Sequence, residues 1–484
     1  MKFRVIIAAV LTTVLSACGG GGGGSSSSEG SGGSGGGGGS TANNAPVFSS
    51  AETASVIEQG DTTVLTVEAS DSDSDSLTFT LSGDDAAAFS LSDSNVLSFA
   101  AAPDFEAPTD LDGDNAYVIV LSVSDGTDSV DQTVTITVTD AYEGRVIDGP
   151  ISGSTVFIDL DGDYTQDTDE PSGTTDSTGA FVVAKATATE GVVPKLISIG
   201  GTDTTTNKAL PDLALVADVP SAAASSAYIT PISTVIAAAA TVEEKAKVLE
   251  SLGVTATDLG SADNAAALVE AFITKDIWSE AEAGNSVAQT LQTKNLQVAA
   301  IIQSAVTFAD TSDTSTAATR AVAMTNAVAA GLVTQAKADL VITSEDAITG
   351  ALAAAITTYA DTVEESLKTA AESATSLAES VVSSLIAIVD QIATVADPTS
   401  SAAVELVKEI QTDTLAAVET LATTVAAASS ADLATVIASA ATTLDTAVST
   451  SINDAVTAAA ATETTVSNEG YSIPQSISVL ETLE

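Results

Sequence analysis

The spacing of apolar residues changes partway along the chain, and this change limits the fold more than any other feature. Between residues 43 and about 215, apolar residues alternate with polar ones, and Gly, Asp and Ser separate the alternating runs. A period of two is typical of strands with one buried face. From about residue 230 the apolar residues recur at steps of three and four, the period of packed helices. The sequence therefore predicts a multidomain protein, with N-terminal all-β antiparallel β-sandwiches followed by an all-α C-terminal helical bundle or set of hairpins.

The composition excludes several classes of site. The 484 residues include 65 acidic and 14 basic side chains, one cysteine and no histidine. Catalytic triads with histidine, His-ligated zinc, internal disulfides and Cys-rich metal clusters are therefore excluded. The net charge of -51 repels phosphate backbones, so we expect no nucleic-acid partner. No nucleophile lies in a convincing catalytic motif, and we expect the protein not to be an enzyme.

Residues 1–18 have the pattern of a bacterial export signal. Lys2 and Arg4 precede an apolar stretch, 5–14, that is too short to cross a bilayer. The Leu-Ser-Ala-Cys sequence that ends at Cys18 resembles the lipobox of bacterial lipoproteins, in which the cysteine becomes the first mature residue and carries the acyl chains. The alternative is an ordinary cleaved signal with a chance cysteine.

The lipobox resemblance implies where the chain is located. Acylated Cys18 would attach it to a lipid bilayer. Gly19 follows the cysteine, which resembles the default sorting to the outer membrane, and we expect a surface-exposed protein. Residues 19–42 are nearly all Gly and Ser, which predicts a flexible tether.

Residues 43–143 resemble a cadherin-like repeat. Strand patterns cover 64–67, 77–81, 117–123 and 133–138, and short acidic motifs lie between and beyond them. Asn-Asn-Ala-Pro-Val-Phe at 43–48 is similar to the start of that repeat. The resemblance implies that calcium ligands are supplied by acidic residues in the family's motifs, namely Glu58, Asp71, Asp73, Asp104, Glu106, Asp125 and Asp140.

Calcium suits these residues chemically, because Ca²⁺ takes six to eight oxygen ligands, mostly carboxylates and carbonyls. About half of the net negative charge lies between Thr41 and Ala180, where Arg145 is the one basic residue. The alternative is an acidic, solvated surface without a metal. Only one repeat is evident, so any site that needs ligands from a second repeat depends on the next domain.

A second β domain is expected at 144–229, and its acidic loop has the spacing of a calcium site. After the strand pattern at 156–158, acids fall at positions 1, 3, 5, 9 and 12 of a loop, which are Asp159, Asp161, Asp163, Asp167 and Glu170. Tyr164 stands where such loops have glycine, so Gly162 is a candidate for making the turn. The loop resembles calcium-binding B-type repeats of bacterial surface adhesins, and 174–181 resembles a transthyretin-like strand-turn-strand.

The remaining chain is alanine-rich and predicted to be helical. Shorter helices are expected within 230–340, beginning at Thr230-Pro231, with Gly253 ending one helix and others at 263–283, 286–309 and 314–338. Longer hairpins or a thin bundle are expected within 341–466, and 467–484 is a tail. Pro398 separates the seams, which contain Val363, Leu385, Ile388, Ile392 and Val395, then Val404, Val418 and Leu421, then Ile437, Leu444 and Val448.

These patterns suggest two functions. The first is a calcium-binding lipoprotein, anchored by Cys18, that acts in adhesion or cell-surface structure through a protein or glycan partner or a second copy of itself. The second is a subunit that assembles into a filament or matrix through its alanine-rich helices. Stalk and lipid-binding roles for these helices also stay open, although a lipid surface usually demands more Lys, Arg and aromatic residues.

Overall fold

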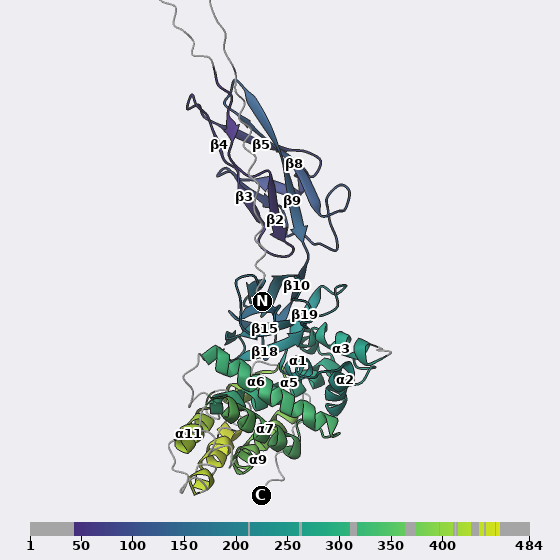
Figure 1. Ribbon diagram of the computed structural model, residues 1–484, viewed down its shortest axis with the longest axis vertical. Coiled ribbons are helices and arrows are strands. Elements are labelled where there is room, and N and C mark those ends of the chain that lie inside the picture. The colour runs from purple at the N-terminus through teal and green to yellow at the C-terminus, as the bar shows by residue number, and fades with distance from the viewer. Residues whose placement is uncertain are drawn as a thin grey trace, which may run out of the picture. The chain divides into compact units, whose positions relative to one another are not determined.

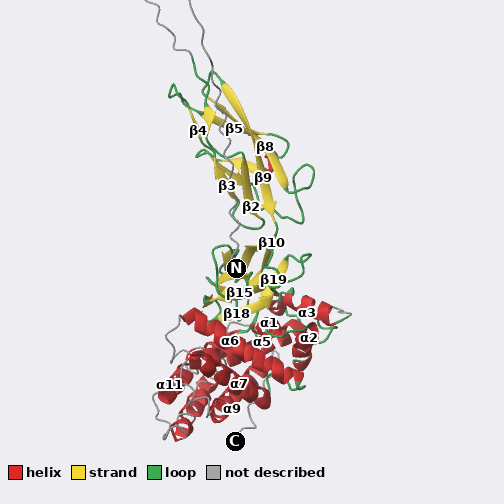
Figure 2. Ribbon diagram, viewed as in Figure 1, coloured by secondary structure: helices red, strands yellow, loops and turns green. Residues whose placement is uncertain are grey.

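The computed structural model describes residues 43–211, 213–260, 264–309, 317–363, 374–395, 397–409, 412, 415–426, 435–439, 442–450 and 452–454. By its contacts the chain divides into two units, 1–44 and 45–484. The second unit holds two β domains followed by helices, as the sequence predicts (Figure 1, Figure 2). The lipobox with Cys18, the whole tether of residues 19–42 and the predicted tail lie outside the described residues.

The first β domain is built from three sheets. A four-stranded sheet has the order β2-β9-β8-β5, a three-stranded sheet has the order β3-β7-β6, and β1 pairs with β4. Most pairs are antiparallel, but β2 runs parallel to β9. The strands are β1 (Val47–Phe48), β2 (Thr53–Ile57), β3 (Thr63–Thr66), β4 (Ala69–Ser70), β5 (Thr78–Ser82), β6 (Phe89–Leu91), β7 (Val96–Phe99), β8 (Ala116–Ser124) and β9 (Ser129–Thr139).

The period-two pattern explains the core of this domain. Along β8, Tyr117, Ile119 and Leu121 are buried while the residues between them are more exposed. Alternate side chains of a strand face opposite sides of a sheet, so this stripe faces the second sheet. There the rings of Phe99 and Tyr117 meet edge to face at 5.0 Å between centroids. All four strand patterns expected within 43–143 correspond to observed strands, namely β3, β5, β8 and β9.

The second β domain follows β9 after a single residue, Asp140. Its sheets have the orders β13-β12-β15-β18, β14-β10-β19 and β11-β16-β17, and the one parallel pair among them is β10 with β19. Gly144 of β10 allows this close approach, since a Cβ there would lie 1.5 Å from the Ala227 carbonyl oxygen. The strands are β10 (Ala141–Val146), β11 (Ile151–Ser152), β12 (Thr155–Asp159), β13 (Ser172–Thr174), β14 (Ala180–Ala184), β15 (Lys195–Ile199), β16 (Thr202–Asp203), β17 (Lys208–Ala209), β18 (Ala214–Asp218) and β19 (Ser226–Ile229).

Helices make up the rest of the described chain. Thr230 caps the first of them by accepting a hydrogen bond from Ser233 N, and Gly253, with φ of +72°, follows the second, as expected. They are α1 (Pro231–Ala237), α2 (Val242–Ser251), α3 (Ala265–Ile273), α4 (Ile277–Glu282), α5 (Ser286–Ala309), α6 (Ala317–Lys337), α7 (Glu345–Val363), α9 (Ala374–Ala393), α10 (Ser401–Glu409) and α11 (Leu415–Ala426).

The prediction of a single helix over residues 263–283 is wrong. The structure places two helices there, α3 and α4, separated by 274–276. The break has a local cause: Asp276 accepts a hydrogen bond from Ser279 N at 3.0 Å, which starts a new helix at Ile277. An aspartate inside an apolar helical pattern was the signal for this break.

The helices pack around α5 as one body. Helices α1, α4, α6, α9 and α11 all contact α5, and a single hydrophobic core runs through the described helices from α1 to residue 448. Described seam residues are buried in this core, including Leu385, Ile388, Ile392, Val418, Leu421, Ile437, Leu444 and Val448. The expected thin bundle is therefore a compact helical body, in which the seams face one another within a single chain.

A buried carboxyl joins the second β domain to α5. Asp148, in the turn between β10 and β11, is buried and accepts a hydrogen bond from the side chain of Gln303 on α5. The side chain of Gln292, also on α5, donates to the backbone carbonyl of Asp148 at 3.3 Å. Burial raises the pKa of Asp148 to about 8, and the nearby charge of Asp203 adds to the rise.

This shifted pKa predicts a pH-dependent stability. An unfolded chain has an Asp148 pKa near 3.8, so between about pH 4 and pH 8 the folded protein binds one more proton. The contribution of Asp148 to the free energy of unfolding is complete below about pH 4 and is lost as pH rises through about 8. Asp148→Asn should flatten the fall in the free energy of unfolding over that range, by at most about 1.4 kcal/mol per pH unit. Chemical denaturation at a series of pH values measures this.

The matched control is Asp84→Asn, which removes the same charge from an exposed position in the first β domain. Its pH profile should follow that of the unchanged protein. An Asp148→Asn profile parallel to the unchanged protein from about pH 5 to pH 9 would contradict the role of this carboxyl.

Candidate metal centres

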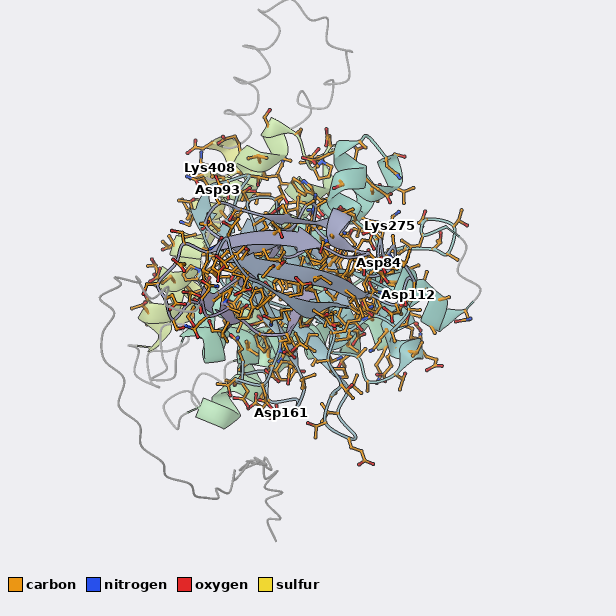
Figure 3. The ribbon with its side chains drawn as sticks, turned by 90° about the horizontal axis from the view of Figure 1, so that it is seen from above. Asp84, Asp93, Asp112, Asp161, Lys275 and Lys408 are labelled. Atoms are coloured by element: carbon orange, nitrogen blue, oxygen red, sulfur yellow. The ribbon has the colours of Figure 1, made fainter. Side chains whose placement is uncertain are left out.

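The described acidic residues form five groups in which carboxylate oxygens lie within 4.8 Å of one another. Exposed members such as Asp112 and Asp161 are labelled in Figure 3. Like charges at this distance repel, and a cation or a proton relieves the repulsion. The groups are Glu58, Asp104 and Glu106; Asp71, Asp73 and Asp75; Asp110, Asp112 and Asp114; Asp159, Asp161 and Glu170; and Asp161, Asp163 and Asp167.

Glu58 is the buried member of the first group. It follows β2 directly, and because β2 is parallel to β9 it lies beside the end of β9. Its side chain is 0 % exposed; Oε2 accepts a hydrogen bond from Phe105 N at 2.7 Å and Oε1 accepts one from Ala141 N at 2.8 Å. The pKa of Glu58 is raised to about 7, mainly by burial and in part by the charges of Glu106 and Glu143, although the two backbone donors oppose the rise.

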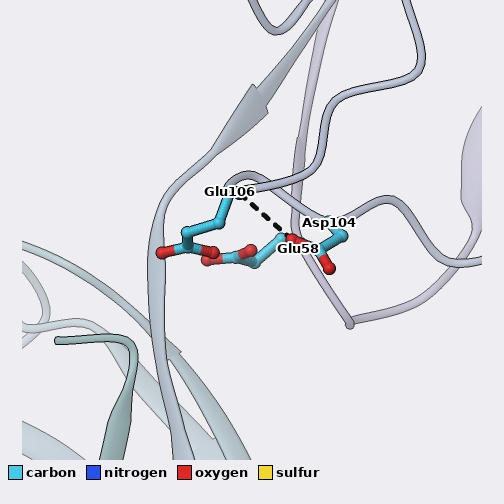
Figure 4. Close-up of side chains that lie close together, drawn as sticks. All are labelled: Glu58, Asp104 and Glu106. Atoms are coloured by element: carbon cyan, nitrogen blue, oxygen red, sulfur yellow. Dashed lines mark hydrogen bonds between the residues drawn. The ribbon is translucent and has the colours of Figure 1, made fainter.

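The loop after β7 supplies the other two carboxylates of this group. Asp104 Oδ1 accepts a hydrogen bond from Glu106 N at 3.1 Å, and the three side chains converge in Figure 4. Two carboxylates therefore face a buried third one that is fixed by backbone groups from both sides. The arrangement supplies only oxygen ligands, which is the donor set that Ca²⁺ prefers.

Glu143 on β10 belongs to the same surroundings, and the sequence analysis missed it. Burial raises its pKa, and the charges of Glu106, Asp104 and Asp140 add to this. The sequence signal that could have identified Glu143 was its short distance from Asp140, which lies just beyond the end of β9. Asp140 itself pairs with Lys185 at 2.7 Å, so part of its charge is already compensated.

Another expected cadherin-like ligand, Asp125, lies at the opposite end of this domain. Asp125 is in the turn that joins β8 to β9, where Thr78 pairs with Ser124, far along both strands from Glu58. Its Oδ1 accepts from Thr127 N and Asp128 N, both at 2.7 Å. The structure thus brings Glu58, Asp104 and Glu106 together and does not bring Asp125 to them.

Asp71 and Asp73 form a group with Asp75, a residue that the sequence analysis missed. Asp71 Oδ1 accepts hydrogen bonds from Asp73 N at 2.8 Å and from Asp75 N at 3.2 Å. These bonds place three alternate carboxylates on one turn just after β4. The repeated Asp-Ser spacing of this turn was the signal for the third residue.

The loop after β12 gathers all five expected residues into two groups that share Asp161. Asp159 and Glu170 are buried, whereas Asp161, Asp163 and Asp167 are exposed. Glu170 closes the loop, because its two carboxylate oxygens accept from Leu160 N at 2.6 Å and from Asp167 N at 3.1 Å. Burial raises the pKa of Glu170, and the charges of Asp159 and Asp161 add to the rise.

Tyr164 makes the turn at the position where glycine is usual. Its φ is +62°, and Gly162 also has a positive φ, of +87°. Left-handed backbone is costly for a bulky residue. The half-buried ring packs against the cluster of Phe157, Ile197 and Val216, which offsets this cost. The expected use of Gly162 is therefore confirmed, but Tyr164 shares the turn.

Comparisons with known proteins identify no family. No known protein-family model matches the chain, and no curated protein matches it. Among the described residues, no helix is both long enough and apolar enough to cross a membrane.

Several solved structures are similar over about a third of the chain. Human protocadherin-24 EC1-2 is 20% identical, with a TM-score of 0.18, over 37% of this chain and 100% of that chain. Drosophila N-cadherin EC1-4 is 18% identical, with a TM-score of 0.18, over 33% and 46% of the two chains. The N-terminal four Ig domains of Dscam1 are 12% identical, with a TM-score of 0.16, over 35% of this chain and 50% of that chain. At these TM-scores the likeness carries no conclusion about ligands.

The charge of Glu106 gives a test of the first group. Without a cation, Glu106→Gln should raise the melting temperature by about 1–2 °C in excess chelator at neutral pH, because it removes a charge that repels Glu58 and Glu143. The control is Glu68→Gln, an exposed glutamate outside the five groups, which should leave the melting temperature unchanged. A lower melting temperature for Glu106→Gln than for the unchanged protein would argue against repulsion in this group.

Proposed function

We propose that this chain is a calcium-binding, membrane-anchored cell-surface protein that acts in adhesion or cell-surface structure and has no catalytic role. The observation that carries the proposal is the Glu58 group. A buried carboxylate fixed by Phe105 N and Ala141 N faces the carboxylates of Asp104 and Glu106 within 4.8 Å. Such an arrangement is destabilising for the protein alone and favourable for an ion with oxygen ligands.

The chemistry of the ligands favours Ca²⁺ over other ions. Zinc and copper sites in proteins rely mainly on His and Cys, and the sequence has no histidine and one cysteine. Mg²⁺ requires near-ideal octahedral geometry and gives up its water reluctantly, whereas Ca²⁺ accepts irregular sets of carboxylates and carbonyls. The loops after β7 and β12 present such irregular sets.

Calcium at the Glu58 group would connect three segments that are distant in sequence. Glu58 follows β2, Asp104 and Glu106 lie in the loop after β7, and Glu143 lies on β10 at the start of the second β domain. A shared ion would resist separation of these segments. Glu143, whose charge interacts with those of Glu106 and Asp104, would be the ligand that the second β domain offers in place of a second repeat.

The anchor and location follow from the lipobox resemblance at Cys18, which implies an acylated, outer-membrane protein exposed at the surface. The partner is a protein or glycan, or a second copy of the chain. Assembly through the alanine-rich seams has less support, because the described seam residues are buried within one chain.

A calcium titration followed by thermal unfolding tests the calcium proposal. Each site should add RT ln(1 + [L]/Kd) to stability, about 2.7 kcal/mol when free Ca²⁺ is 100 times Kd. With affinities usual for extracellular modules, the melting temperature should rise by several degrees at about 10 mM Ca²⁺ and by less in Mg²⁺. Glu106→Gln and Asp161→Asn should each reduce the rise, and Glu68→Gln should not. An unchanged melting temperature up to that concentration would exclude calcium as the ligand.

Adhesion needs a separate measurement. Beads coated with the chain should bind one another, or bind immobilised glycans, in millimolar Ca²⁺ and should separate in chelator, because the ion stiffens the surface presented to the partner. Beads coated with the Glu106→Gln variant should require more Ca²⁺ for the same binding. Equal binding with Ca²⁺ and with chelator would contradict a calcium-dependent adhesive role.

A further inference from the structure

The loop between β7 and β8 carries an acidic group that none of the sequence motifs above includes. Asp110, Asp112 and Asp114 occupy alternate positions, and one carboxylate oxygen from each lies within 4.8 Å of the others. This group shares no residue with the Glu58 group or with the loop after β12. Gly113 and Asn115, with φ of +75° and +64°, bend the backbone around it.

Asp110 has a buried oxygen that the protein leaves unsatisfied. The residue is 8 % exposed, and its Oδ2 accepts a hydrogen bond from Asp114 N at 2.9 Å. Its Oδ1 is buried and has no hydrogen-bond partner among the residues that the structure describes. A buried carboxylate oxygen without a donor costs free energy, and such oxygens are normally paired with donors or cations.

The three carboxylates of this group are crowded together. One carboxylate oxygen from each of the three aspartates lies within 4.8 Å of the others, so their negative charges repel. No basic side chain forms an ion pair with any of the three in the described structure. No described basic side chain therefore compensates the repulsion.

The loop cannot relax by moving its carboxylates apart without breaking other bonds. Asp85, itself buried, accepts from Leu111 N at 2.8 Å and from Val118 N at 2.7 Å, and so ties the loop to β8. Asp114 Oδ1 accepts from Ala116 N at 2.9 Å, and Thr109 N donates to the Tyr117 hydroxyl at 3.0 Å. Both ends of the loop are thus fixed around the three aspartates.

We propose that Asp110, Asp112 and Asp114 bind a Ca²⁺ ion of their own, at a site separate from those in the proposed function. Asp110 supplies its free oxygen from the buried side, and Asp112 and Asp114 supply carboxylates from the exposed side. Water completes the six to eight ligands on the open face of the loop. The ion satisfies the buried oxygen of Asp110 and compensates the repulsion.

Calorimetric titration of the full chain with Ca²⁺ tests the proposal. Asp112→Ala removes a ligand from an exposed position, and Asp93→Ala removes the same group from an exposed turn outside the five groups; both parent residues are labelled in Figure 3. At about 1 mM free Ca²⁺, Asp112→Ala should bind one Ca²⁺ fewer per chain than Asp93→Ala. The same number of bound ions in the two variants would overturn the proposal.

Two further measurements distinguish the loss of this site from unfolding of the chain and from the loss of the other sites. Circular dichroism in chelator should show the same fold for both variants. Chymotrypsin should cut after Leu111, which is 76 % exposed, more slowly with Ca²⁺ than without it in Asp93→Ala, and at equal rates in Asp112→Ala. If Glu106→Ala and Asp161→Ala lose bound Ca²⁺ while Asp112→Ala does not, the proposed function stands and this additional site is excluded.

Discussion

Backbone N–H groups hold the acidic loops of this protein in place against the repulsion of their own carboxylates. Glu58, Asp71, Asp85 and Asp159 each accept two such hydrogen bonds, and in every case the bonds fix a loop next to a strand. Hydrogen bonds to an ionised acceptor are stronger than neutral ones. The loops are therefore formed before any cation arrives, and a cation has only the residual repulsion to remove.

Some of the described basic residues lie where the second β domain meets the helices. Asp218 at the end of β18 pairs with Lys195 of β15 at 2.5 Å and with Lys245 of α2 at 2.6 Å, which links the second β domain to the helices. Arg145 of β10 donates to the Ser279 hydroxyl of α4 at 2.8 Å. Partly buried pairs like these are costly to break, because one partner is then left as an uncompensated charge.

The sequence predicted those features that depend on local pattern. The period of two located four of the nine strands of the first β domain, β3, β5, β8 and β9, and the ligand spacing from Asp159 to Glu170 located one acidic loop. Both signals are contained in short segments. Pairing between distant segments was not predictable in this way. The parallel alignment of β2 with β9 places Glu58 beside Ala141, and nothing in either segment alone specifies that contact.

The same reason explains the residues that were missed. Glu143 reaches the Glu58 group only through the fold, although its distance from Asp140 was visible in the chain. Asp110 has the alternate spacing of its neighbours Asp112 and Asp114, but its buried, unpaired oxygen depends on packing. The helical seams were predicted from their period, whereas their closure around α5 depended on buried side chains from several helices.

The parallel pairing of β2 with β9 also affects how the first domain carries a mechanical load. Tension enters this domain before β2 and leaves it after β9, so the two strands are pulled in opposite directions along their length. The force then loads this ladder in shear. The pairs from Thr53 with Thr135 to Ile57 with Thr139 bear it together and do not open one at a time. The rate of forced unfolding of this domain is set by the simultaneous rupture of that short ladder.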